Sequence, residues 1–238
     1  MSNGGHGSLL QDAVASLSQY FVGDQTLSDT LHRVAELSMS ALPQVTHVGI
    51  TLLVDGRPDT AIFTHPEVPE IDQAQYRTGI GPCLDAFRHG HPYVIDSTLE
   101  AGDWQAFRDS AARHGVMSSM SVPLIVHAGP IGALNMYSET ERAFLDDDVE
   151  IGGAFASQAA FVLANAQAYW DARTLSENMA QAMQSRATIE QAKGIIMSTS
   201  GCTPDQAMDL LVQQSQHQNV KLRDIAREIF DNAMRKGL

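Results

Sequence analysis

Residues 47–63, HVGITLLVDGRPDTAIF, decide the fold of the N-terminal part of the chain. Asp55-Gly56 is a strong signal for a tight hairpin turn, and Ala61-Ile62-Phe63 is the expected return strand. Before the turn, apolar side chains recur with a period of two, which places them on one face of a strand. These are Val48, Ile50, Leu52 and Val54. The stretch therefore predicts an antiparallel β-hairpin.

Further strands and helices are predicted around this hairpin. Amphipathic helices are expected over residues 9–22 and 27–42, and another over 104–114. The Gly- and Pro-rich residues 65–92 are predicted to be loops around one short helix near Leu84–Arg88. The remaining predicted strands are Tyr93–Ile95, Ser121–Val126 and Ile131–Tyr137. Short antiparallel strands between flanking helices predict an α+β domain with one central sheet.

From Asp146 onward the pattern is helical, and a long connecting helix is predicted over residues 147–199. Residues Asp146–Asp148 fit the positive N-terminal end of this helix better than a metal cluster. A 3/4 spacing sustained over five heptads favours a coiled coil, with polar Asn165 setting the register, and hence a homodimer. The alternative is that each half of the helix packs on its own domain. The seam comprises Phe161, Asn165, Ala168, Ala172, Leu175, Met179, Ala182, Arg186, Ile189, Lys193 and Ile196.

A compact helical unit follows. Thr203-Pro204-Asp205-Gln206 combines an N-cap, a Pro at the first helical position and a capping-box Gln, which marks a new helix. The last helix is predicted to bury five apolar residues: Leu222, Ile225, Ala226, Ile229 and Phe230. With the tip of the long helix, these two helices predict a three-helix bundle over residues 175–236.

Charge divides the chain at the same place. The sequence contains 15 Lys and Arg and 28 Asp and Glu, which gives a formal net charge of −13. This charge excludes a protein that coats nucleic acid with a uniformly basic surface. Residues 1–172 contain seven Arg, no Lys and 21 acidic residues, whereas residues 173–238 contain eight Lys and Arg and seven acidic residues. This break indicates two units, of which the second has a local excess of cations.

Composition also bears on location. No apolar stretch approaches the roughly 20 residues that span a bilayer, so no membrane contact is expected. Residues 1–8 lack the features of a signal peptide and are predicted to be a flexible tail. Cys83 and Cys202 fall in different units and outside any CxxC pair, which favours a reducing, cytoplasmic compartment.

Three stretches near the C-terminus resemble the ANTAR domain: SRATIEQAKGIIM (185–197), GCTPDQAMDLL (201–211) and SQHQNVKLRDIA (215–226). That family is a three-helix RNA-binding module of bacterial antiterminators. The resemblance implies that RNA is the partner, in the form of tandem hairpin loops near a transcription terminator. Two modules at the end of one coiled coil would engage the two loops.

The residue types in this unit suit RNA, because cations hold phosphates while polar side chains read exposed bases. Gly194 is poor for helix stability, and its bare backbone permits close approach either of a partner or of a neighbouring helix. The candidate phosphate contacts are Arg186, Lys193, Lys221, Arg223 and Arg227. The candidate base contacts, in an expected turn, are Ser215, Gln216 and Asn219.

Upstream, TGIGPCLDAFRHGHPYVIDS (78–97), SVPLIV (121–126) and IGALNMYSETERAFLDDD (131–148) resemble a GAF domain, covering residues 9–165. The resemblance implies a sensor of a small molecule such as a cyclic nucleotide or cyclic dinucleotide, although the NKFxE signature of the cyclic-nucleotide subclass is absent. Two Arg side chains in the expected pocket suit phosphate or carboxylate, and two aromatic rings suit stacking on a planar ligand. The pocket candidates are Tyr76, Arg77, Cys83, Asp96, Trp104, Phe107, Arg113, Asn135 and Tyr137.

Enzyme and metal chemistry are weaker interpretations. Cys83 precedes a short helix whose N-terminus can lower a thiol pKa, so a GAF-type redox enzyme is one alternative. GAF-fold methionine sulfoxide reductases rely on several cysteines, and this domain has one. His89 and His91 lack further nearby ligands, so no metal is expected. The preferred hypothesis is a non-enzymatic sensor that controls antitermination; the other alternative is a sensory protein whose helical tail only dimerises or contacts a protein partner.

Overall fold

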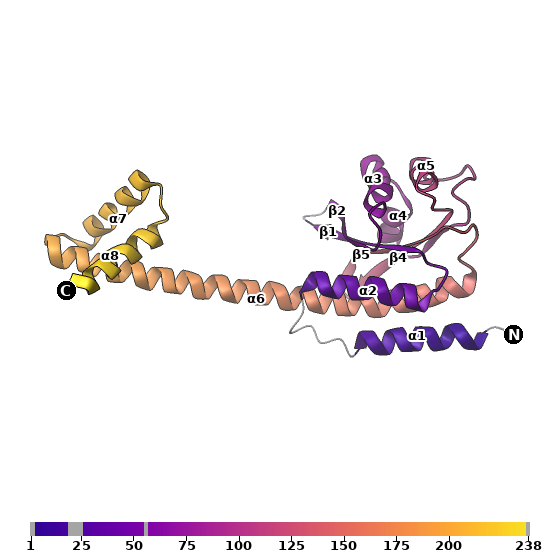
Figure 1. Ribbon diagram of the computed structural model, residues 1–238, viewed down its shortest axis with the longest axis horizontal. Coiled ribbons are helices and arrows are strands. Elements are labelled where there is room, and N and C mark those ends of the chain that lie inside the picture. Colours follow the sequence, from indigo (N-terminus) through magenta and orange to yellow (C-terminus); the bar gives the residue numbers. More distant parts are fainter. Residues whose placement is uncertain (1–2, 19–25, 55–56, 237–238) are drawn as a thin grey trace. The chain divides into compact units, whose positions relative to one another are not determined.

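The computed structural model describes residues 3–18, 26–54 and 57–236 (Figure 1). The chain divides into two compact units at Trp170–Asp171. Helix α6 (Asp146–Ser200) contributes residues to both units. The helical period predicted to begin at Asp146 is thus realised as one element.

A five-stranded antiparallel sheet with strand order β2-β1-β5-β4-β3 is the centre of the N-terminal unit. Ile50 pairs with Ile62 on one side and with Leu134 on the other. The predicted hairpin strands are confirmed, while the predicted turn at Asp55-Gly56 lies outside the described residues. The strands are β1 (His47–Val54), β2 (Arg57–Phe63), β3 (Tyr93–Ile95), β4 (Ser118–Val126) and β5 (Gly129–Ser138).

Helices cover both faces of this sheet (Figure 1). On one face α1 (Asn3–Ser18), α2 (Leu27–Ala41) and the first part of α6 enclose the larger apolar core, which includes buried Val34, Met136 and Phe155. On the other face lie α3 (Val68–Thr78), α4 (Pro82–His89) and α5 (Gln105–Arg113), with a smaller core around Ile71 and Phe107. The predicted α+β fold with a central antiparallel sheet is confirmed.

Two boundaries differ from the sequence prediction. Helix α1 includes residues 3–8 of the predicted flexible tail, whereas residues 1–2, and residues 19–22 of the helix predicted over 9–22, lie outside the described part. The prediction of loops around one short helix in residues 65–92 is wrong, because α3 is a full helix. Its glycines and prolines start and stop helices: Pro69 lies in the first turn of α3, and Gly79 ends it with a left-handed backbone at φ 72°.

The C-terminal unit is a three-helix arrangement of the end of α6, α7 (Pro204–Gln218) and α8 (Leu222–Lys236). The predicted capping box at Thr203 and Gln206 is present. The core is formed by Ala192, Leu211, Ile225 and Ala226. Of the five residues predicted to be buried on α8, Leu222, Ile229 and Phe230 are only half-buried because they lie at the edges of this small core.

In the part of the chain that the structure describes, no helix has the combination of length and apolarity required to cross a membrane.

Close strand packing at Gly132 leads to a stability prediction. A Cβ atom there would collide with the Thr51 backbone carbonyl oxygen of the neighbouring strand β1. We expect Gly132→Ala to lower the free energy of unfolding by about 1–3 kcal/mol, the usual cost of overpacking. The control, Gly153→Ala on α6, adds a Cβ that meets no atom within 4 Å and should raise stability by about 0.5–1 kcal/mol. Urea unfolding measures both, and equal stability of the two variants would contradict the prediction.

Candidate functional site

A fully buried carboxylate, Asp72, lies between α3 and the sheet. Its Oδ1 atom accepts hydrogen bonds from the Tyr137 hydroxyl at 2.6 Å, Gln75 Nε2 at 3.0 Å and Asn135 Nδ2 at 3.4 Å. Its Oδ2 atom accepts from the Thr60 hydroxyl at 2.9 Å. Four donors from α3, β2 and β5 thus converge on one carboxylate.

The network continues from Thr60 through hydroxyl groups to the thiol of Cys83. Because Thr60 donates its only proton to Asp72, Tyr76 must donate to Thr60, and Thr51 must then donate to Tyr76; both distances are 2.8 Å. Cys83 Sγ in turn donates to Thr51 Oγ1 at 3.3 Å. With Asp72 ionised, the donors therefore all point along one direction, from the thiol to the carboxylate.

This network fills the interior next to the sheet. Asn135 also donates to Thr51 at 3.0 Å and accepts from Ser121 at 3.0 Å, so its amide is fully engaged. The cavity beside Thr51 and Cys83 measures about 20 Å³, which is room for about one water molecule. A nucleotide-sized ligand therefore has no space at this position in this conformation.

Burial controls the acidity of the network. It raises the pKa of Asp72 to about 6, against the opposing effect of the donors, of which Tyr137 is the strongest. Burial, followed by the charge of Asp72, raises the pKa of Cys83 to about 12. The lowered thiol pKa considered at the N-terminus of α4 is therefore wrong, since desolvation dominates there. A thiol that stays protonated at neutral pH is a poor nucleophile, which argues against redox catalysis by Cys83.

The other predicted pocket residues do not join this network. Trp104, at a left-handed φ of 59°, donates its indole N–H to Asp85 at 2.7 Å and packs edge-on against Tyr93. Phe107 is buried in the smaller apolar core, and Asp96 is exposed. The nine candidates thus separate into a buried polar group (Tyr76, Cys83, Asn135, Tyr137), a core residue, two surface residues and the pair Arg77 and Arg113.

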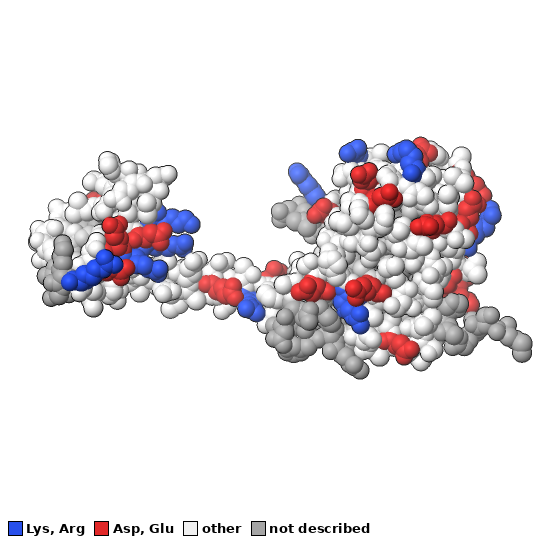
Figure 2. All heavy atoms as spheres, in the orientation of Figure 1, with Lys and Arg blue, Asp and Glu red and all other residues white. Residues whose placement is uncertain are grey.

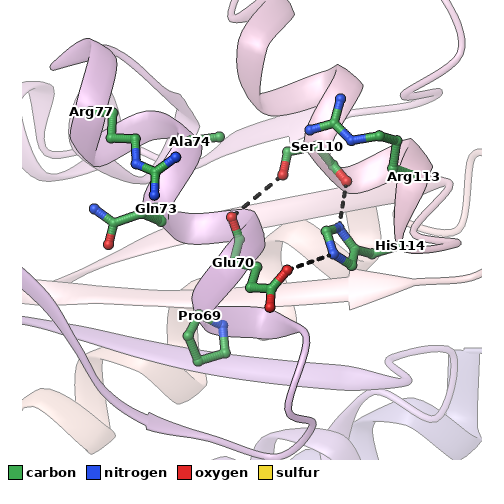
Figure 3. A pocket seen from close by; sticks show the side chains of 8 residues that line it. All are labelled: Pro69, Glu70, Gln73, Ala74, Arg77, Ser110, Arg113 and His114. Atoms are coloured by element: carbon green, nitrogen blue, oxygen red, sulfur yellow. Dashed lines mark hydrogen bonds and ion pairs between the residues drawn. The ribbon is translucent and has the colours of Figure 1, made fainter.

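Arg77 and Arg113 line a groove on the outer side of α3 and α5, with a volume of about 660 Å³ (Figure 3). At one end His114 lies 3.2 Å from a carboxylate oxygen of Glu70. The remaining lining residues are Pro69, Gln73, Ala74 and Ser110. The structure thus places the two arginines apart from the buried polar group.

Sequence reasoning missed Asp72, Gln75, Thr51 and Thr60. A signal was present, because Val68, Ile71, Asp72 and Gln75 recur at the three- and four-residue spacing of a helix face. Assigning the segment to loops hid that periodicity, and with it the polar residues that face the sheet.

In the C-terminal unit, several predicted cations lie on an accessible surface. Arg223, Asp224 and Arg227 of α8 line a polar cleft of about 150 Å³ with Ser185 and two glutamines of α6, and Arg223 Nε lies 3.7 Å from a carboxylate oxygen of Asp224. Arg186, the next residue on α6, is exposed, as is Lys221 before α8. Figure 2 shows Lys and Arg side chains gathered on this unit, among a few acidic ones. Such a cleft suits an anion with several oxygens.

Lys193 and Gly194 differ from each other in their surroundings. The Lys193 ammonium lies 3.0 Å from both carboxylate oxygens of Glu190, and only 17% of its side chain is exposed. A Cβ at Gly194 would meet no atom within 4 Å, so the close approach of a neighbouring helix is not the reason for this glycine. Gly194 instead lines an open groove of about 340 Å³ with Phe230 and Met234.

The turn between α7 and α8 is built from the remaining candidates. Asn219 ends α7 with a left-handed φ of 53°. Ser215 stabilises this turn, since its hydroxyl donates a hydrogen bond to the Val220 carbonyl oxygen at 2.6 Å. The side chains of Gln216 and Asn219 are exposed. Of the three candidates, these two are available to a ligand.

An α+β unit with helices on both faces of its sheet is thus joined to a helical unit that holds every lysine of the chain. The chain belongs to the GAF domain family, which matches residues 24–164, and it carries an ANTAR domain over residues 177–229. This is the architecture of a sensor–regulator with an RNA-binding antitermination module. A GAF domain can bind small molecules, but the match specifies no ligand.

Solved structures share the fold of the N-terminal unit. The free methionine-R-sulfoxide reductase of Neisseria meningitidis, with its substrate, is 18% identical at a TM-score of 0.52, covering 69% of this chain and 91% of that one. A domain described as part of a two-component sensor histidine kinase protein from Sinorhizobium meliloti is 14% identical at a TM-score of 0.51, covering 63% and 99%. A comparison with curated protein sequences finds no match. At these identities the similarity concerns the fold alone.

Asp72 generates a pH prediction. Because its pKa is raised in the folded protein, the folded state binds this proton more tightly than the unfolded chain does, and the contribution to stability is present below about pH 4 and lost as the pH rises through about 6. From pH 4 to 7 the stability of Asp72→Asn should therefore rise relative to wild type, by on the order of 3 kcal/mol at about 1.4 kcal/mol per pKa unit.

Urea unfolding at pH 4, 5, 6 and 7 measures this difference for wild type and Asp72→Asn. The matched control is Asp59→Asn, which changes an exposed carboxylate on β2 of the same unit. Parallel pH profiles for wild type and Asp72→Asn would show that Asp72 does not titrate as described.

Proposed function

We propose that the protein regulates transcription antitermination. The ANTAR domain binds tandem hairpin loops in nascent mRNA near a terminator, and the GAF domain senses a signal that is passed to it through α6. The observation that carries this proposal is the set of cations on the ANTAR domain, of which Arg186, Lys221 and Arg227 are exposed and Arg223 is half-buried, in a chain with a net charge of −13. Selective recognition of an RNA loop needs a local cluster of cations, not a basic surface over the whole protein.

The C-terminal unit offers separate surfaces for the parts of an RNA loop. The cleft with Arg223 and Arg227 suits phosphate oxygens, which accept paired hydrogen bonds from guanidinium groups. The groove between Gly194 and Phe230 is apolar enough to receive a base. Exposed Gln216 and Asn219 supply donors and acceptors for base edges. Lys193, paired with Glu190, acts mainly in support of this surface.

The same proposal includes a homodimer formed through a coiled coil of α6. In the C-terminal unit, Leu175 and Met179 of the predicted seam are 61% and 59% exposed. Large apolar side chains exposed at a 3/4 spacing are typical of a helix that pairs with another. A dimer presents two ANTAR domains to two loops and raises the effective concentration for the second contact.

The same proposal includes the boundaries of the domains and the cellular location of the protein. The GAF sensor spans residues 9–165, the connecting helix 147–199 and the ANTAR domain 175–236, and the protein acts in the cytoplasm, where nascent mRNA is made. A small-molecule ligand of the GAF domain is included, without a resident cofactor. The competing function, in which the helical tail contacts only proteins, draws its support from the apolar groove beside Gly194.

An RNA-binding assay tests the proposal. We expect purified protein to shift a tandem-hairpin RNA in a gel, and Arg223→Ala to weaken binding roughly tenfold, equivalent to about 1.4 kcal/mol. Loss of one phosphate contact should also flatten the salt dependence by about one unit of slope. Arg33→Ala, which removes an exposed arginine of α2 paired with Glu36, is the control and should bind as wild type does. Absence of any shift at moderate salt would reject RNA binding and favour the protein-contact alternative.

Oligomeric state tests the coiled coil separately. The double variant Leu175→Glu, Met179→Glu places like charges at the proposed seam, so it should sediment as a monomer while wild type sediments as a dimer. Ile80→Glu, at a 55% exposed position in the GAF domain, is the control and should remain dimeric. A monomeric wild type, or a dimeric double variant, would contradict the proposed interface; sedimentation velocity distinguishes these outcomes.

A further inference from the structure

The arginines of the GAF domain differ in whether their guanidinium groups have an ion-pair or hydrogen-bond partner. Arg33, Arg88 and Arg142 each pair with a carboxylate, at 2.9–3.2 Å. Arg108 donates to the backbone carbonyl groups of Ser97, Glu100 and Asp103. Among the described residues of this unit, the guanidinium groups without such a partner are those of Arg57, Arg77 and Arg113. Two of these three line the same groove between α3 and α5.

The groove holds the two arginines on separate rigid elements. Arg77 comes from the last turn of α3 and Arg113 from the last turn of α5 (Figure 3). Helices α3 and α5 pack against the smaller apolar core through Ile71 and Phe107, which fixes their spacing. Both side chains are exposed, and the groove volume of about 660 Å³ accommodates a small organic molecule.

His114 and Glu70 lie in contact at one end of this groove. Its Nδ1 atom faces the Ser110 carbonyl oxygen at 2.8 Å, and its Nε2 atom faces a Glu70 carboxylate oxygen at 3.2 Å. Glu70, the acidic residue of this groove, is therefore in contact with His114, and no described carboxylate pairs with Arg77 or Arg113.

The two arginines of the groove stand out in an acidic domain, because they carry positive charge that no described carboxylate neutralises. Residues 1–172 hold seven Arg and 21 acidic residues, yet no carboxylate of a described residue pairs with Arg77 or Arg113. An anion bound in the groove would be attracted to both positive charges. Guanidinium groups bind carboxylate and phosphate groups through paired hydrogen bonds, and the neighbouring Gln73 amide can donate as well.

We propose that the outer α3/α5 groove is an anion-binding site that uses Arg77 and Arg113 to take a small organic dianion, such as a phosphate monoester or a dicarboxylate. The site is separate from the interior, where the Asp72 network leaves about 20 Å³ beside Cys83. This inference rests on the proposed sensor role and locates its ligand on the outside of the helical layer.

Isothermal titration of the full-length protein tests the site at constant ionic strength. Glycerol 3-phosphate represents the phosphate monoesters and succinate the dicarboxylates, and glycerol is the uncharged control. We expect one of the two dianions to bind saturably and glycerol not to bind. In Arg77→Gln and in Arg113→Gln the affinity should fall about tenfold or more, while Arg57→Gln, which removes the third unpartnered arginine outside the groove, binds as wild type does.

Two results would overturn the proposal: absence of saturable binding of either dianion up to about 10 mM, or equal affinity in wild type and both groove variants. Circular dichroism melting of each variant establishes that it is folded, so loss of binding in a folded protein reports on the groove. Failure of this site is distinguishable from failure of the proposed function. The tandem-hairpin gel shift without added dianion depends on Arg223 of the ANTAR domain, and the titration depends on Arg77 and Arg113.

Discussion

The burial of the Asp72 carboxylate is the constraint on which the GAF domain's interior depends. A buried charge is tolerated when hydrogen-bond donors surround it, and each of its four donors comes from a defined place on α3, β2 or β5. Because Thr60 also bonds to Tyr76, and Gln75 to the backbone N–H of Cys83, the position of α3 over the sheet is set by polar geometry as well as by apolar contact. The thiol of Cys83 is the far end of that network, and its burial, followed by the charge of Asp72, keeps it protonated by raising its pKa.

Filling the interior changes where a signal can act. In a domain with an open central cavity, a ligand replaces water; here it would have to replace a satisfied set of hydrogen bonds, and each unpaired buried group would cost about 1–3 kcal/mol. The outer groove carries no such cost, since Arg77 and Arg113 are exposed and make no ion pair with a described residue that a ligand would have to replace. A ligand bridging α3 and α5 would bear directly on the helical layer that the Asp72 network connects to the sheet.

The sequence predicted the strands better than the helices between them. Strict alternation in residues 48–54 gave a clear signal, and the capping box at Thr203 gave an equally clear helix start. Helix α3 was missed because its prolines and glycines were interpreted as loop formers, although they stand at its ends. Of the nine predicted pocket residues, four (Tyr76, Cys83, Asn135, Tyr137) lie in one network, but Asp72, which accepts from Asn135 and Tyr137, is defined only by tertiary packing.

The distribution of lysine determines where amine-reactive reagents can modify the chain. Every lysine of this chain falls after residue 172, and of these Lys193 is held against Glu190 whereas Lys221 is exposed. Amine-directed chemistry, whether enzymatic acetylation or a laboratory cross-linker, is therefore confined to the ANTAR half of the polypeptide apart from the terminal amine. A reagent that reacts with primary amines would label the proposed RNA-binding surface at Lys221 but no side chain of the sensor, so the reactivity of Lys221 would report on whether that surface is occupied.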